Sequence, residues 1–307
     1  MKPVVMDVDT GVDDALALIL ALRSPELHLE AITTVAGNAP LEAATRNTRL
    51  VLDVAQAPAA LRVARGAARP LLRELLTASE VHGTDGLGNT TRVYPPPKHP
   101  LAPTEAATVL LEAIARYGRQ LTIVATGPMT NLARAALEAP ETFHRVGVIV
   151  QMGGAVQVRG NTSPVAEFNL YVDPEAAAEV LASGVRLRLV PLDVTQQAIL
   201  ERRELRRRAQ ERDSAVFQFI REFTVLYFDF HQRRQALNGG YLHDPVAVAA
   251  AIDPGLFTWQ PARVEVRTEE AERGRSVVTP QADSPVAVAT GLAVDRFLPL
   301  FLDRVCR

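Results

Sequence analysis

Four aspartates fall within eight residues near the start of the chain, in the segment VVMDVDTGVDDALAL. They follow an apolar run at residues 4–6 and precede a helical pattern of apolar residues. The segment therefore predicts a strand, a tight turn at Gly11 and a helix. Carboxylates this close repel one another unless a cation lies between them, and a hard divalent ion with oxygen ligands is the simplest candidate. The four residues are Asp7, Asp9, Asp13 and Asp14.

Helix capping is the alternative explanation for these acids. An aspartate at a helix start accepts hydrogen bonds from free N–H groups and complements the helix dipole, which would account for Asp13 and Asp14. It does not account for Asp7 and Asp9, because they lie at the end of the strand. In an open α/β sheet the ligand crevice lies at the carboxyl ends of the strands, so we interpret the cluster as a ligand site.

Strand-like and helix-like segments alternate along the 307 residues. This alternation predicts an α/β fold with a mostly parallel central sheet flanked by helices. The only linker-like stretch, residues 94–103, is too short to separate domains, so we expect a single domain over residues 1–307. The expected strands are 4–6, 27–35, 121–125, 146–152, 186–190, 264–266 and 276–278, the last two paired. The expected helices are 13–22, 41–55, 104–116, 130–137, 174–182, 202–211, 215–230, 245–251 and 294–305.

Charge and composition exclude several classes of protein. The net charge is −2, and the basic run at residues 201–208 is interrupted by glutamates, so an exposed helix face explains it better than a nucleic-acid site. The single cysteine, Cys306, rules out a disulfide framework or a Cys-based metal site within one chain. No signal peptide and no run of ~20 apolar residues is present, which predicts a cytoplasmic protein without a membrane partner.

Polar residues also follow the later strands. Asn38 comes after the second expected strand, Thr126 after the strand at 121–125, and Asp193 after the strand at 186–190, while Met152 closes the strand at 146–152. Taken singly, Asn38 and Thr126 are typical turn residues. Their repeated placement at strand ends predicts that all of them lie on one rim of the sheet.

Two further segments carry polar residues suited to a site. The first, RGNTSPVAEFNLYVDPEAA, holds Asn161, Glu167 and Asn169 in a long, largely irregular stretch of the kind that is often functional, although turn and cap chemistry is the alternative. Asp173 before a proline is best explained as a helix N-cap. The second, GGYLHDPVAVAAA, holds His243 and Asp244. Asp244 is either an N-cap or a metal ligand, and His243 could supply a proton near neutral pH.

Taken together and in order, these motifs resemble the inosine-uridine-preferring nucleoside hydrolases over nearly the whole chain. They are DVDTGVDDALAL, VAGN, VHGTDGLG, ATGPMTNLA, VQMGGA, GNTSPVAEFNLYVDPEAA and LHDPVAVA. The resemblance implies hydrolysis of the N-glycosidic bond of purine or pyrimidine ribonucleosides to ribose and free base, in nucleoside salvage and catabolism. It also implies a bound Ca²⁺, a small-molecule ribonucleoside as the partner, and a homodimer or homotetramer.

Carried over to this chain, the resemblance implies specific roles. Asp9, Asp14 and Asp244 would bind Ca²⁺ through carboxylates and Thr126 through its backbone carbonyl. Asp9 would also be the general base toward a calcium-bound water, and Asp7 would support the cluster from behind. The implied substrate contacts are Asp13, Asn38, His82, Met152, Asn161, Glu167 and Asn169. His243 would act on the leaving base, as an acid or as an orienting group.

Only a few residues of the sequence indicate which base the protein prefers. Relatives specialised for purines by aromatic stacking tend to carry tryptophan directly before the last aspartate. His243 holds that place here, which favours the inosine-uridine or pyrimidine type. The helix before it often carries tyrosine near the base, and this chain has His231 there, with Gln235 one turn later. We hypothesise that His231 or Gln235 contacts the base.

Two other functions remain as alternatives. The start DVDTG is also similar to the nucleophile motif of haloacid-dehalogenase-like phosphatases, which use Mg²⁺ and a lysine in mid-chain. The only lysines here are Lys2 and Lys98, and neither is suitably placed. A non-catalytic nucleoside- or ribose-binding protein on the same fold is the second alternative. The presence of every implied metal and ribose ligand argues against it.

Overall fold

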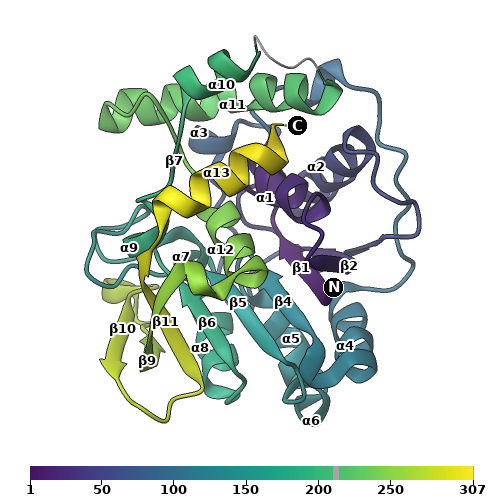
Figure 1. The fold of residues 1–307 in the computed structure, drawn as a ribbon. Coiled ribbons are helices and arrows are strands. Elements are labelled where there is room, and N and C mark those ends of the chain that lie inside the picture. Colours follow the sequence, from purple (N-terminus) through teal and green to yellow (C-terminus); the bar gives the residue numbers. More distant parts are fainter. Residues whose placement is uncertain (210–213, 307) are drawn as a thin grey trace.

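The computed structural model describes residues 1–209 and 214–306, and a nine-stranded sheet runs through them (Figure 1). The strand order is β10-β9-β11-β6-β5-β4-β1-β2-β3, and within it β9 is antiparallel to both of its neighbours while the other pairs are parallel. The strands are β1 (Lys2–Val8), β2 (Leu27–Thr34), β3 (Arg62–Arg65), β4 (Thr122–Ala125), β5 (Val148–Met152), β6 (Leu187–Val190), β9 (Phe257–Val266), β10 (Ser276–Pro280) and β11 (Val286–Leu292). A separate two-stranded sheet pairs β7 (Ile199–Glu201) with β8 (Gly239–Tyr241).

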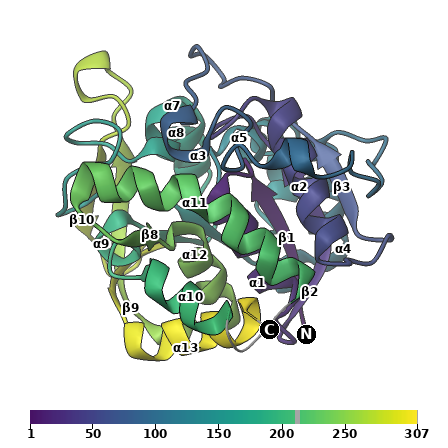
Figure 2. The same ribbon diagram turned by 90° about the horizontal axis from the view of Figure 1, so that it is seen from above.

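Helices cover both faces of this sheet and one end of the molecule, where Figure 1 places α10 and α11 above α1 and α12 and Figure 2 shows them from above. The helices are α1 (Val12–Leu22), α2 (Leu41–Val54), α3 (Ser79–His82), α4 (Ala106–Tyr117), α5 (Thr130–Glu138), α6 (Pro140–Phe143), α7 (Phe168–Val172), α8 (Pro174–Ala182), α9 (Leu192–Thr195), α10 (Arg202–Ala209), α11 (Ala215–Gln235), α12 (His243–Ile252) and α13 (Val294–Val305).

The sheet separates two hydrophobic cores. Because successive side chains of a strand point to opposite faces, Val4 and Met6 of β1 pack with α1, α11, α12 and α13, whereas Val5 packs with α4, α5 and α8. The side chains of Val4, Val5 and Met6 are fully shielded from solvent. Burial on both faces explains why the strands are nearly continuous apolar runs.

The first strand lies at a topological switch point. β1 pairs with β2 on one side and with β4 on the other. The chain leaves the carboxyl end of β1 toward β2 and leaves that of β4 toward β5, so the two connections run in opposite directions along the sheet. Such a point opens a crevice at the carboxyl ends of the strands. The loops after β1, β2 and β4 therefore meet there, and they carry the aspartate cluster, Asn38 and Thr126.

The expected α/β fold with a mostly parallel sheet and flanking helices is confirmed, as is the antiparallel pairing of β9 with β10. The expectation was incomplete at the sheet edges. It lacked β3, β11 and the paired strands β7 and β8, and it placed only the last three residues of the ten-residue β9. β3, β7 and β8 are only three or four residues long, and the first part of β9 is mostly exposed or half-buried, so the apolar pattern is weak there. β11 reads VAVATGL, an apolar run that the expectation overlooked.

Helix boundaries differ from expectation by a few residues in most cases. α11 extends to Gln235, five residues beyond the expected end. α10 is described to Ala209, and the rest of the expected helix 202–211 lies outside the described residues. Asp173 caps α8 as expected, since its carboxylate accepts a hydrogen bond from the backbone N–H of Ala176. No helix within the described ranges has the length and apolar character needed to cross a bilayer.

Candidate active site

A pocket of about 760 Å³, including its open mouth, lies at the carboxyl end of the sheet. It brings together residues more than 200 positions apart in the chain. The sequence-predicted residues that line it are Asp13, Asn38, His82, Thr126, Met152, Asn161, Glu167, Asn169, His231, His243 and Asp244. Asp9 and Asp14 lie behind this lining and are fully buried.

The carboxylates of Asp13, Asp14 and Asp244 form a compact cluster. Each offers one oxygen, and these oxygens all lie within 4.8 Å of one another. Asp244 is in the first turn of α12, but Leu242 is the N-cap, so capping does not explain Asp244. Buried carboxylate oxygens that converge in this way suit a hard divalent cation. We call these three residues, with Asp9 and Asn38, the carboxylate end of the pocket.

Asp14 connects three loops at this end. Its Oδ2 accepts hydrogen bonds from the backbone N–H of Gly11 at 2.9 Å and from Asn38 Nδ2 at 3.0 Å, and its Oδ1 accepts one from Thr126 Oγ1 at 2.7 Å. The bond to Gly11 belongs to a capping arrangement at the start of α1. Helix capping thus accounts for one of the contacts of Asp14, while the other two tie α1 to the loops after β2 and β4.

Asn38 holds Asp9 as well. The backbone N–H of Asn38 donates to Asp9 Oδ2 at 2.6 Å, and its Nδ2 is 3.2 Å from Asp9 Oδ1. A Cβ atom at Gly37 would lie 2.1 Å from Asp9 Oδ2, so only glycine fits this approach of the loop to the carboxylate. Asp9 stands outside the three-carboxylate cluster and is joined to Asp14 through the Asn38 amide.

Asp7 is directed to the other side of the strand end. Its Oδ1 accepts hydrogen bonds from Thr33 Oγ1 and from Asn131 Nδ2, whereas its Oδ2 has no partner among the described residues. Asn131 also donates to the carbonyl of Thr34. Burial raises the pKa of Asp7 to about 7. Asp7 therefore braces β1 against β2 and α5 and does not line the pocket.

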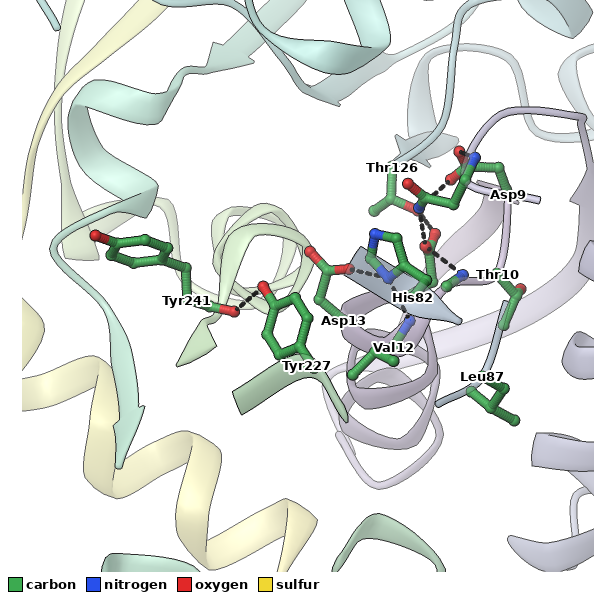
Figure 3. A network of polar contacts seen from close by, with 12 residues as sticks. Asp9, Thr10, Val12, Asp13, His82, Leu87, Thr126, Tyr227 and Tyr241 are labelled. Carbon is green, nitrogen blue, oxygen red and sulfur yellow. Dashed lines mark hydrogen bonds and ion pairs between the residues drawn. The ribbon is translucent and has the colours of Figure 1, made fainter. Parts of the chain in front are cut away.

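Burial dominates the electrostatics of the carboxylate end. It raises the pKa of Asp13 to about 8, with the charge of Asp14 as the second cause, and it raises the pKa values of Asp9 and Asp244 well above their usual range. Oδ1 of Asp13 makes no hydrogen bond within the described residues, and His82 Nδ1 is 4.0 Å away (Figure 3). A cation would relieve this concentration of negative charge and allow the carboxylates to stay ionised together.

The segment expected to be largely irregular contains the short helix α7, so that expectation was wrong in part. Glu167 is its N-cap and accepts hydrogen bonds from the backbone N–H groups of Asn169, Leu170 and Gly154. Burial raises the pKa of Glu167 to about 7. Asn169 Nδ2 donates to the carbonyl of Thr126 at 2.6 Å. This is the carbonyl that, by the resemblance, would bind the metal.

Asn161 stabilises the same segment from its other end. Its Oδ1 accepts a hydrogen bond from the backbone N–H of Phe168 at 2.9 Å. Asn161 and Glu167 therefore have two roles. Both side chains hold the start of α7, and both line the pocket. Asp193, expected on the same rim, accepts from the backbone N–H groups of Val156 and Gln157 and is not part of the pocket lining.

Five neighbouring rings also line the pocket, beside the carboxylates, and we call them the aromatic arc. The centroid distances between successive rings are 5.8 Å, 4.6 Å, 5.1 Å and 5.3 Å. The rings come from α3, α11, β8 and α12, and Figure 3 shows Tyr227 between Asp13 and Tyr241. In order along the arc, the members are His82, Tyr227, His231, Tyr241 and His243.

The three histidines of the arc are held neutral by burial. It lowers the pKa of His82 and of His243 to about 3 and that of His231 to about 4. His82 Nδ1 accepts a hydrogen bond from the backbone N–H of Val12, at the start of α1. His231 Nδ1 lies 3.4 Å from Gln235 Oε1, while its Nε2 is buried without a partner among the described residues.

Tyr227 and Tyr241 were missed by the sequence analysis. Tyr227 precedes His231 by four residues on α11, so the two rings share one helix face. That spacing could have identified Tyr227 once His231 was chosen. Tyr241 precedes His243 by two residues, and the two-stranded sheet of β7 and β8 that positions it was not predicted. The hydroxyl of Tyr227 donates to the carbonyl of Tyr241 at 2.9 Å and joins α11 to this small sheet.

Comparison with known proteins decides the family. The model of the inosine-uridine preferring nucleoside hydrolases matches residues 4–299. The chain belongs to this nucleoside hydrolase family. A Leishmania major inosine-uridine preferring nucleoside hydrolase is 37% identical over 313 residues, which cover 100% of this chain and 98% of that protein. As a member of the family, this chain is an N-glycosidase of the ribonucleoside hydrolase class.

Other relatives differ in the base that their names specify. A pyrimidine-specific ribonucleoside hydrolase of Salmonella paratyphi B is 37% identical over 278 residues, with 90% of this chain and 88% of that protein covered. The solved structure of a purine-preferring ribonucleoside hydrolase from Gardnerella vaginalis superposes with a TM-score of 0.92 at 32% identity, covering 99% of this chain and 98% of the other. Nucleoside hydrolases with different base preferences thus share this fold, and the base must be distinguished by local side chains.

Proposed function

We propose that this nucleoside hydrolase cleaves the N-glycosidic bond of purine or pyrimidine ribonucleosides with the help of Ca²⁺, and that Asp9 is the general base. The observation that carries the proposal is the division of one pocket into two unlike ends. Carboxylates and amides gather at one end and neutral imidazole and phenol rings at the other. A ribonucleoside has the same division, since its ribose is rich in hydroxyls and its base is flat.

The residues of the carboxylate end fit a calcium ion. Asp14 and Asp244 supply buried carboxylate oxygens, the carbonyl of Thr126 is a further candidate, and Asp9 is linked to Asp14 through Asn38. Ca²⁺ takes ~6–8 oxygen ligands, so the hydroxyls of a ribose would complete such a site. When bound, the ion would acidify and orient a water molecule. Asn169 would release the Thr126 carbonyl and hold a ribose hydroxyl instead.

The same side chains suit the charge changes of the reaction. Breaking a ribosyl C–N bond builds positive charge on the sugar, and nearby carboxylates and amide oxygens stabilise it. Asp9 accepts the proton of the attacking water, and Asp13 with Asn38 holds the 2′-hydroxyl. The 3′- and 5′-hydroxyls lie with Asn161, Glu167 and Asn169, and Met152 forms the floor beneath the ribose.

The aromatic arc receives the leaving base. Tyr227 and Tyr241 offer ring surface for stacking, and His82 lies at one end of the arc. His231 contributes a buried Nε2 without a partner, which a polar group of the base would satisfy. His243 is neutral at physiological pH, so it assists departure of the base by donating a hydrogen bond rather than as a preformed imidazolium.

A panel of uridine, cytidine, inosine, adenosine and guanosine tests the proposal. Release of free base and reducing sugar is measured with and without a calcium chelator. We expect turnover that chelation abolishes and that added Ca²⁺ restores better than Mg²⁺. Binding of nucleosides without turnover would favour the non-catalytic binding protein instead.

Hydrolysis of a phosphate ester would favour the phosphatase. Lys2 Nζ donates to the carbonyls of Ala251 and Ile252, and neither lysine lines the pocket, which speaks against that alternative. The homodimeric or homotetrameric assembly and the cytoplasmic location stay predictions.

A further inference from the structure

We propose that Thr195 is a positioning residue that holds His243 in the tautomer with its proton on Nε2, directed at the leaving base. This inference rests on the proposed function and adds a residue that the motifs do not include. Thr195 Oγ1 lies 2.7 Å from His243 Nδ1, and the two residues are 48 positions apart in the chain. Both side chains are buried, with 0% and 9% of their surface exposed.

The direction of this hydrogen bond follows from the partners that the hydroxyl has. Thr195 Oγ1 makes no other hydrogen bond within the described residues, and a buried O–H group that donates to nothing is costly. The hydroxyl therefore donates to Nδ1, which then accepts through its lone pair. A neutral imidazole carries one proton, so that proton is on Nε2.

Nε2 is the atom of His243 left for the substrate. His243 lines the pocket, and its Nε2 has no hydrogen-bond partner within the part of the chain that is described. An Nε2–H group in this position donates to a ring nitrogen or carbonyl oxygen of the base, where negative charge develops as the glycosidic bond breaks. The opposite tautomer would present a lone pair there and repel the same atom.

The element that carries Thr195, α9, is also held by hydrogen bonds to a loop outside α12. The backbone N–H of Leu192 donates to the carbonyl of Gly154 at 2.9 Å. The carboxylate of Asp193 accepts from the backbone N–H groups of Val156 and Gln157 at 2.8 Å and 2.7 Å. α9 is thus anchored to the loop that follows β5, so Thr195 gives His243 a reference point outside its own helix.

The test compares Thr195→Val, which has the same shape without the hydroxyl, with Thr195→Ser, which keeps it. Thr224→Val is the matched control, because Thr224 is also buried but donates to the carbonyl of Ile220 in its own helix. Each variant is assayed with uridine, with inosine and with 4-nitrophenyl β-D-ribofuranoside. The nitrophenolate group of the last substrate departs without needing a proton or a hydrogen bond from the enzyme.

For Thr195→Val we expect kcat for uridine and inosine to fall about 10- to 100-fold, in line with the loss of assistance to a leaving group. Turnover of the nitrophenyl riboside should change less than about twofold. Thr195→Ser should recover most of the loss, and Thr224→Val should behave as wild type. Thermal unfolding of each variant checks that the fold is kept.

Two results would overturn the inference. One is an equal loss on all three substrates, which would indicate a general disturbance of the pocket. The other is no loss on the natural nucleosides. In both cases turnover by the wild-type protein would leave the proposed function intact. If the wild type released base from no nucleoside, the proposed function would fail and this inference with it.

Discussion

The carboxylate end of the pocket and the aromatic arc differ in where their side chains come from. Asp9 and Asn38 of the carboxylate end follow β1 and β2, and Thr126 beside them follows β4. These strands are neighbours in the parallel sheet, and only Asp244 of the carboxylate end comes from a distant helix, α12. Of the rings in the aromatic arc, only His243 lies next to the start of a helix that the sequence predicts. The others lie on α3, α11 and β8, which the sheet does not align.

The two ends also differ in how they are held. Hydrogen bonds of 2.6–3.2 Å link Asp9, Asp14, Asn38 and Thr126 in one network. The arc is held by ring packing and by separate hydrogen bonds that do not form one network. They join Val12 N–H to His82, the Tyr227 hydroxyl to the carbonyl of Tyr241, and Thr195 to His243. Relatives named for different bases share the fold, so we expect the carboxylate end to carry the chemistry and the arc to carry the choice of base.

Asp9→Asn should have the largest effect at the carboxylate end. It removes the proposed base and weakens the metal site together, so kcat should fall by more than about 10³-fold while thermal unfolding changes little. The measurement is base release from uridine and inosine. Asp295→Asn, an exposed site on α13, is the control. Turnover near the wild-type rate in Asp9→Asn would contradict the mechanism.

Asn38→Leu tests whether the amide bridge supports the metal. It removes the Nδ2 donor shared by Asp9 and Asp14 but keeps the size of the side chain. Loss of such a supporting contact typically costs ~10–100-fold in metal affinity or activity. Calcium titration followed by calorimetry measures the affinity, and the exposed Asn238→Leu is the control. An unchanged calcium affinity would show that the bridge does not support the metal site.

His231→Ala and Gln235→Ala probe the arc. If His231 Nε2 bonds to the base, kcat/KM should change about 3- to 10-fold and unequally among nucleosides, because one net hydrogen bond is worth about 1 kcal/mol. The bond cleavage carried out at the carboxylate end should be preserved, so each variant should still turn over. His144→Ala, at an exposed position, is the control. Identical kinetics for every nucleoside in both variants would rule out a base contact by either residue.

The stability of the metal-free protein should depend on pH with opposite signs for the two ends. The pKa of Asp13 is raised to about 8 in the folded chain, so the folded state binds more protons from about pH 4 to 8. Its contribution to the free energy of unfolding falls as pH rises through this window. The pKa of His231 is lowered to about 4 against about 6.5 unfolded, so its contribution falls as pH drops from 6.5 to 4.

Calcium and a single substitution separate these two effects. Added Ca²⁺ should reduce the loss of stability at high pH, because the ion stabilises the ionised carboxylates of the carboxylate end. The contributions of Asp7 and Glu167, whose pKa values burial raises to about 7, should remain. His231→Phe should flatten only the acid side, by up to about 3 kcal/mol at pH 4. Thermal unfolding from pH 4 to 9 measures both. A calcium-insensitive alkaline limb would contradict the assignment of the carboxylate end as a metal site.

Much of the fold and one end of the site could be predicted from the sequence. Apolar runs bounded by polar turns identify the central strands, and parallel strands bring their carboxyl ends to one rim. Asn38 and Thr126 could therefore be placed beside the aspartates without coordinates. The four-residue strand β3 could not be recognised in this way, and neither could the short α7 within a polar segment.

The three histidines of the aromatic arc were expected from the sequence, but its two tyrosines and the order of its rings required the tertiary structure. α11 reads AVFQFIREFTVLYFDFHQRRQ, which is apolar around most of its circumference, so periodicity does not show which face meets the pocket. The hydrogen bond between Thr195 and His243 joins two short elements, and the two residues are 48 positions apart in the chain. No local sequence pattern predicts such a contact.

By itself the sequence determined the α/β class, the family and the aspartate cluster with its neighbours at the strand ends, because these depend on periodicity and on motifs in local order. Only the tertiary structure decided which carboxylates converge, with Asp13, Asp14 and Asp244 together and Asp9 held apart through Asn38. It also decided which rings line the pocket beside these carboxylates. Both depend on side-chain packing between elements distant in the chain, where a few ångströms separate a contact from none.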